Sequence, residues 1–168
     1  ALPSSIMHYD GNVWTATPNP NLTSLTRIWG SGASDVWALG GSSLLHYDGT
    51  KWAAVAVSGL TTFSAGATAG PEDVWVAGDA LQVMRYNGIA WSAAFPITEV
   101  WTWMWAGSET NIWGLGTSGS IFHYDGLAAT KDTSAALLNK TWTSLWGTGP
   151  ADLWAASATE VVHWDGAT

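Results

Sequence analysis

The chain has 168 residues and a formal net charge of −8, from 5 basic and 13 acidic side chains, and it contains no Cys. Nucleic acids and anionic membranes bind proteins through clustered Lys and Arg, so this composition excludes a nucleic-acid partner and argues against binding to a membrane surface. Membrane insertion is not expected, because no apolar run is long enough for a spanning helix. Without Cys, disulfides, thiol catalysis and Cys-bound metals are excluded.

In chain order, the first recognisable feature is His8-Tyr9-Asp10-Gly11, a motif that returns every 38 to 40 residues. Its copies occupy residues 8–11, 46–49, 85–88, 123–126 and 163–166. A second motif, of the Asp-Val-Trp type, recurs at intervals of 38 to 41 residues, at 35–37, 73–75, 111–113 and 152–154. Two anchors that keep register over four periods indicate tandem repeats of one supersecondary unit.

Each period contains four short segments typical of β-strands, at 25–29, 35–39, 44–47 and 51–57 in the first complete repeat. The Asp-Gly pair before the last segment predicts a type I′ hairpin turn. No segment has a convincing helical period. Four strands repeated at this spacing predict an all-β fold, namely a β-propeller of four-stranded antiparallel blades with about four blades per chain.

The predicted strands do not add up to whole blades. The segments at 6–9 and 161–164 are both third strands, so this strand type occurs five times and the other three occur four times. Residues 1–168 are therefore expected to form a single propeller domain that closes imperfectly, or a part of a larger propeller. We favour the larger ring, in which further blades or a second copy of the chain complete the circle.

The aligned repeats resemble tectonin-type (tachylectin-like) repeats. The resemblance rests on an apolar-Trp strand, a short turn, and a strand that ends at Tyr-Asp-Gly, with Trp soon after it. These features are clearest at residues 112–115 with 121–126 and at 36–39 with 44–52. The resemblance implies a lectin propeller that binds sugars or lipopolysaccharide. The chain departs from the family in having no Cys and few repeats, and no individual sugar contact can be transferred.

Three sets of repeated residues are candidates for ligand contact. A sugar ring presents an apolar face that an indole covers, and its hydroxyl groups need fixed polar partners. The candidates are the Trp residues that end the first strands (Trp29, Trp105, Trp146), those that follow the hairpin (Trp14, Trp52, Trp91), and the Asp residues that begin the second strands (Asp35, Asp73, Asp152). For each set, packing or backbone hydrogen bonding within the fold is the alternative.

Other repeated residues are expected to be structural. The second-strand Trp residues should lie in the core, because blades pack against both faces of that strand. The four His residues occur in different repeats, so we expect them to brace strands rather than to bind a metal. One first strand alone carries three alternating Trp residues, Trp101, Trp103 and Trp105. Strand alternation predicts that they share one face, which serves either for packing or as an aromatic platform. An insert at 127–139 is expected to be a loop.

Taken together, these observations favour non-catalytic carbohydrate binding, with glycans as partners at sites repeated around the ring. The alternative is a protein-interaction or structural propeller within a larger secreted or surface protein. No nucleophile elbow or close pair of carboxylates is evident, so we expect no enzymatic activity and no cofactor. The low charge and the abundance of Trp, Thr, Ser and Gly favour a secreted or cell-surface location.

Overall fold

The computed structural model describes residues 5–21, 23–134, 137, 140–149 and 151–166. In these residues the regular structure consists of 17 β-strands without a helix, which confirms the predicted all-β class. Among the described residues, therefore, no helix is long and apolar enough to cross a membrane. The strands are β1 (Ser5–Tyr9), β2 (Trp14–Pro18), β3 (Arg27–Gly32), β4 (Asp35–Gly40), β5 (Ser43–Tyr47), β6 (Trp52–Ala54), β7 (Phe63–Gly70), β8 (Asp73–Gly78), β9 (Gln82–Tyr86), β10 (Trp91–Pro96), β11 (Trp101–Ser108), β12 (Asn111–Gly116), β13 (Ile121–Tyr124), β14 (Ala129–Lys131), β15 (Trp142–Gly149), β16 (Asp152–Ser157) and β17 (Val161–Trp164).

The strands form five antiparallel sheets, which follow one another in chain order. Three sheets have four strands each, β3–β6, β7–β10 and β11–β14, and consecutive strands pair within them. The hairpin β1–β2 precedes these sheets, and the three-stranded sheet β15–β17 follows them. In the described part of the chain the third strand thus occurs five times and each other strand type four times, which confirms the predicted inventory.

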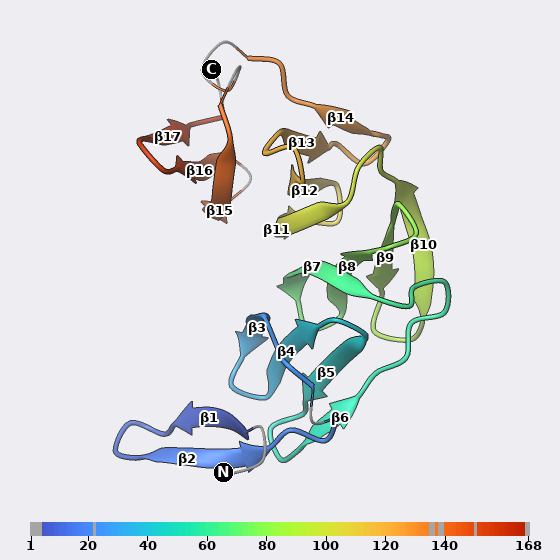
Figure 1. Ribbon diagram of the computed structural model, residues 1–168, viewed down its shortest axis with the longest axis vertical. Coiled ribbons are helices and arrows are strands. Elements are labelled where there is room, and N and C mark those ends of the chain that lie inside the picture. The colour runs from blue at the N-terminus through green and yellow to red at the C-terminus, as the bar shows by residue number, and fades with distance from the viewer. Residues whose placement is uncertain (1–4, 22, 135–136, 138–139, 150, 167–168) are drawn as a thin grey trace.

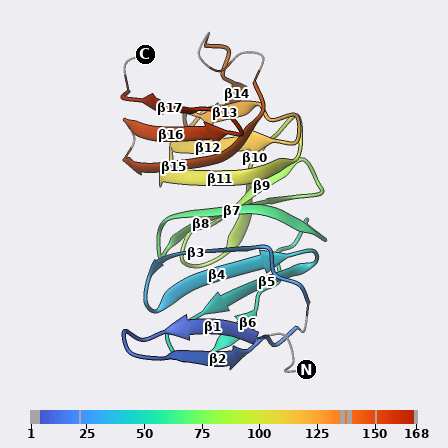
Figure 2. The same ribbon diagram turned by 60° about the vertical axis from the view of Figure 1, so that its left-hand side comes forward.

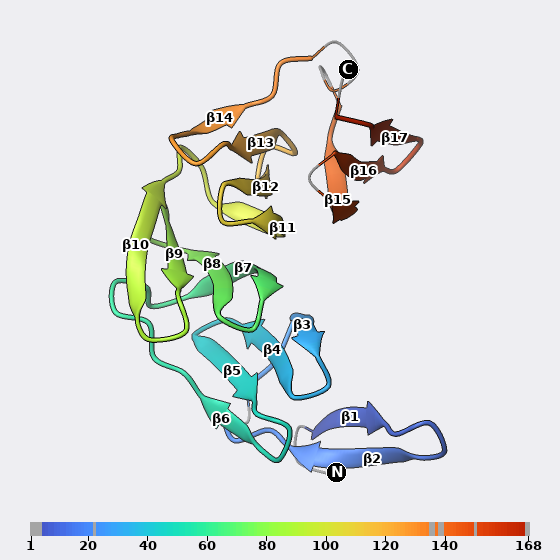
Figure 3. The same cartoon turned by 180° about the vertical axis from the view of Figure 1, so that it is seen from behind.

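The sheets are arranged as the blades of an open arc (Figure 1). Strands β3, β7, β11 and β15 lie on its inner side, and β6, β10 and β14 lie on its outer side. A turned view shows the sheets stacked one after another along the chain (Figure 2). The hairpin β1–β2 and the sheet β15–β17 form the two ends of the arc, and the view from behind shows the same separation (Figure 3).

The apolar core lies between neighbouring sheets. Three clusters of buried side chains fill the spaces between the successive sheets from β3–β6 to β15–β17. Because a central sheet has a neighbour on each face, its second strand is buried on both sides, and all six residues of β12 are buried. The large indole rings of Trp37, Trp75 and Trp113 fill these spaces and are at most 4% exposed, as expected for core positions. The same expectation was wrong for Trp154 of the sheet β15–β17, which is 41% exposed, because the described residues place no further sheet against it.

The turns between third and fourth strands differ from the predicted type I′ geometry. Tyr47 pairs with Trp52, so the loop between them has four residues. Within this loop only Gly49 has a positive φ, of 91°, whereas a type I′ turn requires positive φ at both central residues. Instead, Asp48 Oδ1 accepts the backbone N–H groups two and three residues further on, both at 2.9 Å. The predicted turn type was therefore wrong, because a side-chain hydrogen bond stabilises a longer loop.

The insert at 127–139 is not entirely a loop. Strand β14 lies within it and pairs with β13, so the sheet gains its fourth strand at the expected place. The prediction of a loop over the whole insert was wrong for this segment, because the backbone groups of β13 are available to pair there. Residues 135, 136, 138 and 139 of the insert lie outside the described residues.

Candidate functional site

A polar brace joins the second and third strands of the first complete sheet. Asp35 Oδ1 accepts a hydrogen bond from Trp37 Nε1 at 2.8 Å and lies 2.9 Å from His46 Nε2. The Trp37 and His46 rings stack with their centroids 4.2 Å apart. The Asp35 carboxylate is buried and thereby satisfies a buried indole N–H group. This contact matches the bracing role predicted for His46, and it gives Asp35 a partner within the protein.

The same brace recurs in the sheet β11–β14 with an amide in place of the carboxylate. Asn111 Oδ1 accepts from Trp113 Nε1 at 2.9 Å and lies 2.8 Å from His123 Nε2. Burial lowers the pKa of His123, while the carboxylates of Asp125 and Asp132 act in the opposite direction. The neutral Asn111 shows that the brace depends on an acceptor oxygen and does not need a charge.

The brace is more exposed in the last sheet. Asp152 Oδ1 lies 2.6 Å from His163 Nε2 and accepts a longer hydrogen bond of 3.2 Å from Trp154 Nε1. Hydrogen bonds from Thr148, His163 and Trp154, in that order, lower the pKa of the Asp152 carboxyl. The third predicted Asp position of this set is thus also engaged within its own sheet.

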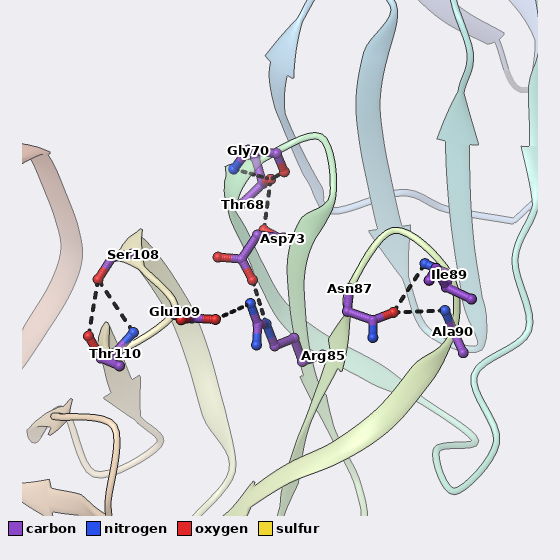
Figure 4. Close-up of polar contacts among 10 residues, drawn as sticks. All are labelled: Thr68, Gly70, Asp73, Arg85, Asn87, Ile89, Ala90, Ser108, Glu109 and Thr110. Carbon is purple, nitrogen blue, oxygen red and sulfur yellow. Dashed lines mark hydrogen bonds and ion pairs between the residues drawn. The ribbon is translucent and has the colours of Figure 1, made fainter.

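In the sheet β7–β10 an arginine replaces the His (Figure 4). Arg85 Nε donates to Asp73 Oδ1 at 2.6 Å, and Arg85 Nη2 donates to Glu109 Oε2 of the next sheet at 2.8 Å. Burial acts to lower the pKa of Arg85, but the hydrogen bonds to both carboxylates outweigh it and raise that pKa. The guanidinium lies 5.1 Å from the centroid of the Trp75 ring. Asp73 is therefore part of an ion-pair network that connects two sheets.

The His residues do not come together. Each lies in a different sheet, and no group of three or more His, Asp or Glu side chains among the described residues is placed to hold a metal ion. Chelation needs several ligands that converge on one point, and the blade architecture separates these side chains.

The first-strand Trp residues occupy the spaces between inner strands. Trp105 Nε1 donates to the Gly147 carbonyl of the next sheet at 2.9 Å. Trp29 lies against Gly66 of the next sheet, where a Cβ atom would approach the indole ring to 2.3 Å, so only glycine fits. Trp146 is exposed, because no sheet among the described residues packs against that face of β15–β17. Two of the three predicted contact residues are thus half-buried in packing, and the third is accessible.

The Trp residues that follow the hairpins show the same division. Trp52 and Trp91 are half-buried, and each ring packs on the Tyr of its own hairpin with centroids 5.4 and 5.5 Å apart. Trp91 also meets Trp37 of the preceding sheet edge-on at 5.9 Å. Trp14 belongs to the terminal hairpin and is exposed. Position in the arc, rather than position in the repeat, thus decides which of these indoles is accessible.

The three Trp residues of β11 do not share one face, contrary to the prediction. A β-bulge between Trp101 and Trp103 breaks the alternation, because it adds one residue to β11 relative to β12. Trp101 is fully buried in the cluster shared with the preceding sheet. Trp103 and Trp105 pack toward the following sheet, where their indole N–H groups donate to backbone carbonyls. Of the two roles that the sequence left open, these contacts support packing rather than an aromatic platform.

A pocket on the inner wall of the arc joins three first strands, β3, β7 and β11. We call it the inner-wall pocket. It is lined by Arg27, Ile28, Trp29, Ala65, Gly66, Trp103 and Met104. Strand β7 contributes only small side chains here, so Arg27 reaches across it. Arg27 Nη2 donates to the Thr102 carbonyl at 3.4 Å, and its guanidinium carbon lies 5.0 Å from the Trp103 ring centroid.

Two donors of residues that line the inner-wall pocket have no protein acceptor. Arg27 Nε and Trp29 Nε1 are both buried without a hydrogen-bond partner, as are Trp75 Nε1 and Trp101 Nε1 in the core. A buried donor without an acceptor costs about 1–3 kcal/mol, so a movement of the two side chains that brings these donors to an oxygen acceptor in the pocket would be favoured. The sequence analysis singled out Trp29 but missed Arg27. The available signal was that Arg27 is the only charged side chain in any of the four first strands as the structure defines them.

Comparison with known proteins identifies solved structures that share this fold. No protein-family model matches the chain, and no curated protein is similar to it in sequence. Solved structures do match: YCF48 bound to D1 peptide (16% identity, TM-score 0.67), virginiamycin B lyase from Staphylococcus aureus (14%, 0.68) and the outer coat vertex of COPII on membranes (10%, 0.72). The fold is that of a β-propeller. These matches cover 99%, 96% and 98% of this chain, whereas the chain spans only 60%, 63% and 53% of theirs.

These matches correct one expectation from the sequence. The absence of a catalytic motif predicted that the chain is not an enzyme, and the similarity to virginiamycin B lyase contradicts that inference, because the same propeller fold carries an enzyme. Catalytic side chains in a propeller come from separate blades, so a linear motif is not a reliable sign of their absence. At 14% identity the match shows the fold alone and assigns no reaction to this chain.

Proposed function

We propose that the chain is a protein-interaction propeller whose inner-wall pocket holds an oxygen-bearing segment of a partner polypeptide. The observation that carries this proposal is the pair of unpartnered buried donors, Arg27 Nε and Trp29 Nε1, in one pocket. Peptide carbonyl and carboxylate oxygens are the acceptors that such donors need. The apolar walls at Ile28, Trp103 and Met104 suit an aliphatic or aromatic side chain beside that acceptor.

Two further observations support a polypeptide ligand. The repeated Trp residues of the inner sheets are used in packing between blades, which removes the main argument for one sugar site per blade. Among the matched structures, YCF48 is described with a bound peptide and the COPII vertex is a protein coat, so propellers of this shape serve in protein recognition. That use of the fold supports protein recognition as the function of this chain, but it does not identify a partner.

Selection from a random phage-displayed peptide library on the immobilised chain tests the proposal. The selected peptide is then synthesised and its dissociation constant is measured by calorimetry. Loss of a charge-assisted hydrogen bond is worth about 1.5–3 kcal/mol, so Arg27→Ala should weaken binding by roughly 10- to 100-fold. Trp29→Phe should weaken it less, because only the indole donor and part of the ring are lost. Arg85→Lys, in a separate ion-pair network, serves as the control and should bind as the wild type does.

Failure to select any peptide, or equal binding by the Arg27→Ala variant, would contradict this proposal. Thermal unfolding of each variant shows whether the fold is kept. Arg27 is half-buried, and its guanidinium contacts two backbone carbonyls, those of Thr26 and Thr102, and one ring face, so its removal should leave the sheets intact.

Carbohydrate binding, which the tectonin-type resemblance implies, stays a prediction. Trp14 and Trp146 are the candidate residues with the most accessible indole rings for stacking on a sugar. A glycan array probed with the labelled chain tests it directly. Binding that is lost in Trp14→Ala or Trp146→Ala and kept in Arg27→Ala would favour a lectin, and the opposite pattern would favour the peptide site. A secreted or surface location also stays a prediction.

A further inference from the structure

A surface pocket lies between the sheets β3–β6 and β7–β10, away from both ends of the arc (Figure 1). Both sheets have all four strands, so complete repeats form the pocket. We call it the junction pocket. Its volume is about 340 Å³, and it shares no lining residue with the inner-wall pocket. Its walls include Trp37, His46, Glu72, Tyr86, Gly88 and Trp91.

Aromatic rings form most of the walls of the junction pocket. The Trp91 ring lies edge-on to Trp37 at 5.9 Å and against Tyr86 at 5.5 Å between centroids. Trp37 is almost fully buried, whereas Tyr86 and Trp91 are half-buried and so keep part of their rings accessible. The face of an aromatic ring carries partial negative charge and attracts cations. The two accessible rings therefore suit a cationic group.

The rim of the junction pocket carries a carboxylate without a partner. Glu72 is exposed, and no hydrogen bond or ion pair joins it to another described residue. Its side chain lies across Gly88, where a Cβ atom would approach the Glu72 Cβ and Cγ atoms to 2.9 Å. None of the described residues that line the pocket is Lys or Arg. The pocket thus offers a negative charge that the chain itself does not balance.

The next junction along the arc shows what occupies the equivalent space. Arg85 pairs with Trp75 across β8 and β9. His46 pairs with Trp37 across β4 and β5 in the same register, so His46 and Arg85 are equivalent in their repeats. The Arg85 guanidinium lies 5.1 Å from the centroid of the Trp75 ring and donates to Glu109 of the following sheet (Figure 4). A guanidinium therefore sits between an indole ring and an acidic turn at that junction.

At the junction pocket the acidic turn is present and the guanidinium is not. Glu72 lies in the turn before β8, as Glu109 lies in the turn before β12. The shorter His46 side chain forms an ion pair with Asp35 of its own sheet and not with Glu72. The turns before β4 and β16, at 33–34 and 150–151, contain no acidic residue in the sequence. Of the junctions between the described sheets, only this one combines an acidic turn with a missing guanidinium.

We propose that the junction pocket binds an arginine side chain of a partner polypeptide, which takes the place that Arg85 occupies at the next junction. A planar guanidinium stacks on an aromatic ring and donates to a carboxylate at the same time, whereas an ammonium group is a strongly hydrated point charge. Trp91 and Tyr86 supply the rings and Glu72 the carboxylate. The net charge of −8 also favours the approach of a basic partner. The inference rests on the proposed function only for the source of the arginine.

Nuclear magnetic resonance titration of the isotope-labelled chain with Nα-acetyl-arginine methylamide provides the first test. The indole N–H signals of Trp37 and Trp91, assigned by substitution of each with Phe, should shift and reach saturation. Nα-acetyl-citrulline methylamide has nearly the same shape without the charge and serves as the matched probe. It should bind at least about 5-fold more weakly, because the ion pair and the cation–π contact are both lost.

Three variants locate the binding site. Glu72→Gln should raise the dissociation constant of the arginine probe by about 5-fold, whereas Glu109→Gln changes the equivalent turn of the next junction and should bind as the wild type does. His46→Arg supplies a guanidinium from the chain itself, so it should abolish binding of the probe. Near-ultraviolet circular dichroism checks that each variant remains folded.

Equal binding of the arginine and citrulline probes would overturn the proposal. Unchanged binding of the arginine probe by folded Glu72→Gln and His46→Arg chains would also overturn it. Failure of this proposal is distinguishable from failure of the proposed function. A chain that binds the arginine probe but selects no library peptide contradicts only the inner-wall pocket, and a chain that selects peptides but does not discriminate between the two probes contradicts only the junction pocket.

Discussion

Replacement of Asp35 by Ala should cost more stability than its single side chain suggests. The carboxylate is the acceptor for the buried Trp37 indole N–H and for His46. Without it, the Trp37 donor is left buried and unsatisfied, at a cost of about 1–3 kcal/mol. The His46 side chain is 31% exposed, so water replaces most of its lost contact and the additional cost is about 1 kcal/mol or less. The expected decrease in the free energy of unfolding is therefore about 2–4 kcal/mol.

The chain supplies its own control for this substitution. Asn111 occupies the equivalent position in the sheet β11–β14 and makes the same two contacts through Oδ1. Asp35→Asn keeps this oxygen, and Ser31, which donates to the second carboxylate oxygen, has a hydroxyl that can accept from an amide instead. We therefore expect Asp35→Asn to cost less than about 1 kcal/mol.

Urea denaturation followed by Trp fluorescence measures both variants against the wild type. Near-ultraviolet circular dichroism reports whether the Trp37 environment is kept. A cost below about 1 kcal/mol for Asp35→Ala would refute the argument that the brace satisfies a buried donor. Equal costs for the Ala and Asn variants would also refute it, because charge rather than an acceptor oxygen would then be responsible.

Three further predictions concern the turns and the braces. Hydrogen bonds from the Thr50 hydroxyl and from the backbone N–H groups of the following residues lower the pKa of Asp48 to about 2. Its carboxyl group should therefore remain mostly ionised at pH 3 in a nuclear magnetic resonance titration. A titration midpoint at the ordinary value of 3.8 would contradict this prediction. Burial lowers the pKa of His123 below 6.5, so the unfolded chain binds a proton at this side chain more readily than the folded chain, and the free energy of unfolding should fall as the pH drops through and below 6.5. His123→Gln should weaken this pH dependence of the free energy of unfolding, as measured by urea titrations. An unchanged pH dependence would show that other groups cause it. Gly49→Ala places a side chain at a φ of 91° and only 2.8 Å from the Ser34 Cβ, so it should cost about 1–2 kcal/mol, and a midpoint of urea denaturation equal to that of the wild type would disprove the strain.

The repeat pattern was sufficient to predict most of the architecture. The recurring Tyr-Asp-Gly and Asp-Val-Trp motifs located all five third strands, four of which continue into a hairpin, and all four second strands, because each repeat folds from local antiparallel pairing. The bracing role of the His residues followed from the same logic, since four residues in four blades do not converge. What the pattern missed were local departures from regular pairing, such as the bulge at Trp101 and the four-residue turn at Asp48.

The candidate site was less accessible to sequence reasoning. Repetition drew attention to residues that recur in every blade, and the structure uses most of those for packing. The inner-wall pocket depends on residues that do not repeat: Arg27, which has no basic counterpart in the other first strands, and the small side chains of β7 beside it. Arg27 and Thr102 are 75 residues apart in the sequence, and only the stacking of three sheets brings them into contact.

The repeats in the sequence by themselves determined a β-sheet protein with cores between repeated units, and the abundant Trp supplies the large apolar side chains that fill the space between stacked sheets. The tertiary structure alone decided which of those Trp residues remain accessible. Chemically equivalent indoles are buried in the interior of the arc and exposed at its two ends, since burial depends on whether a neighbouring sheet is present and not on the residue or its place in the repeat.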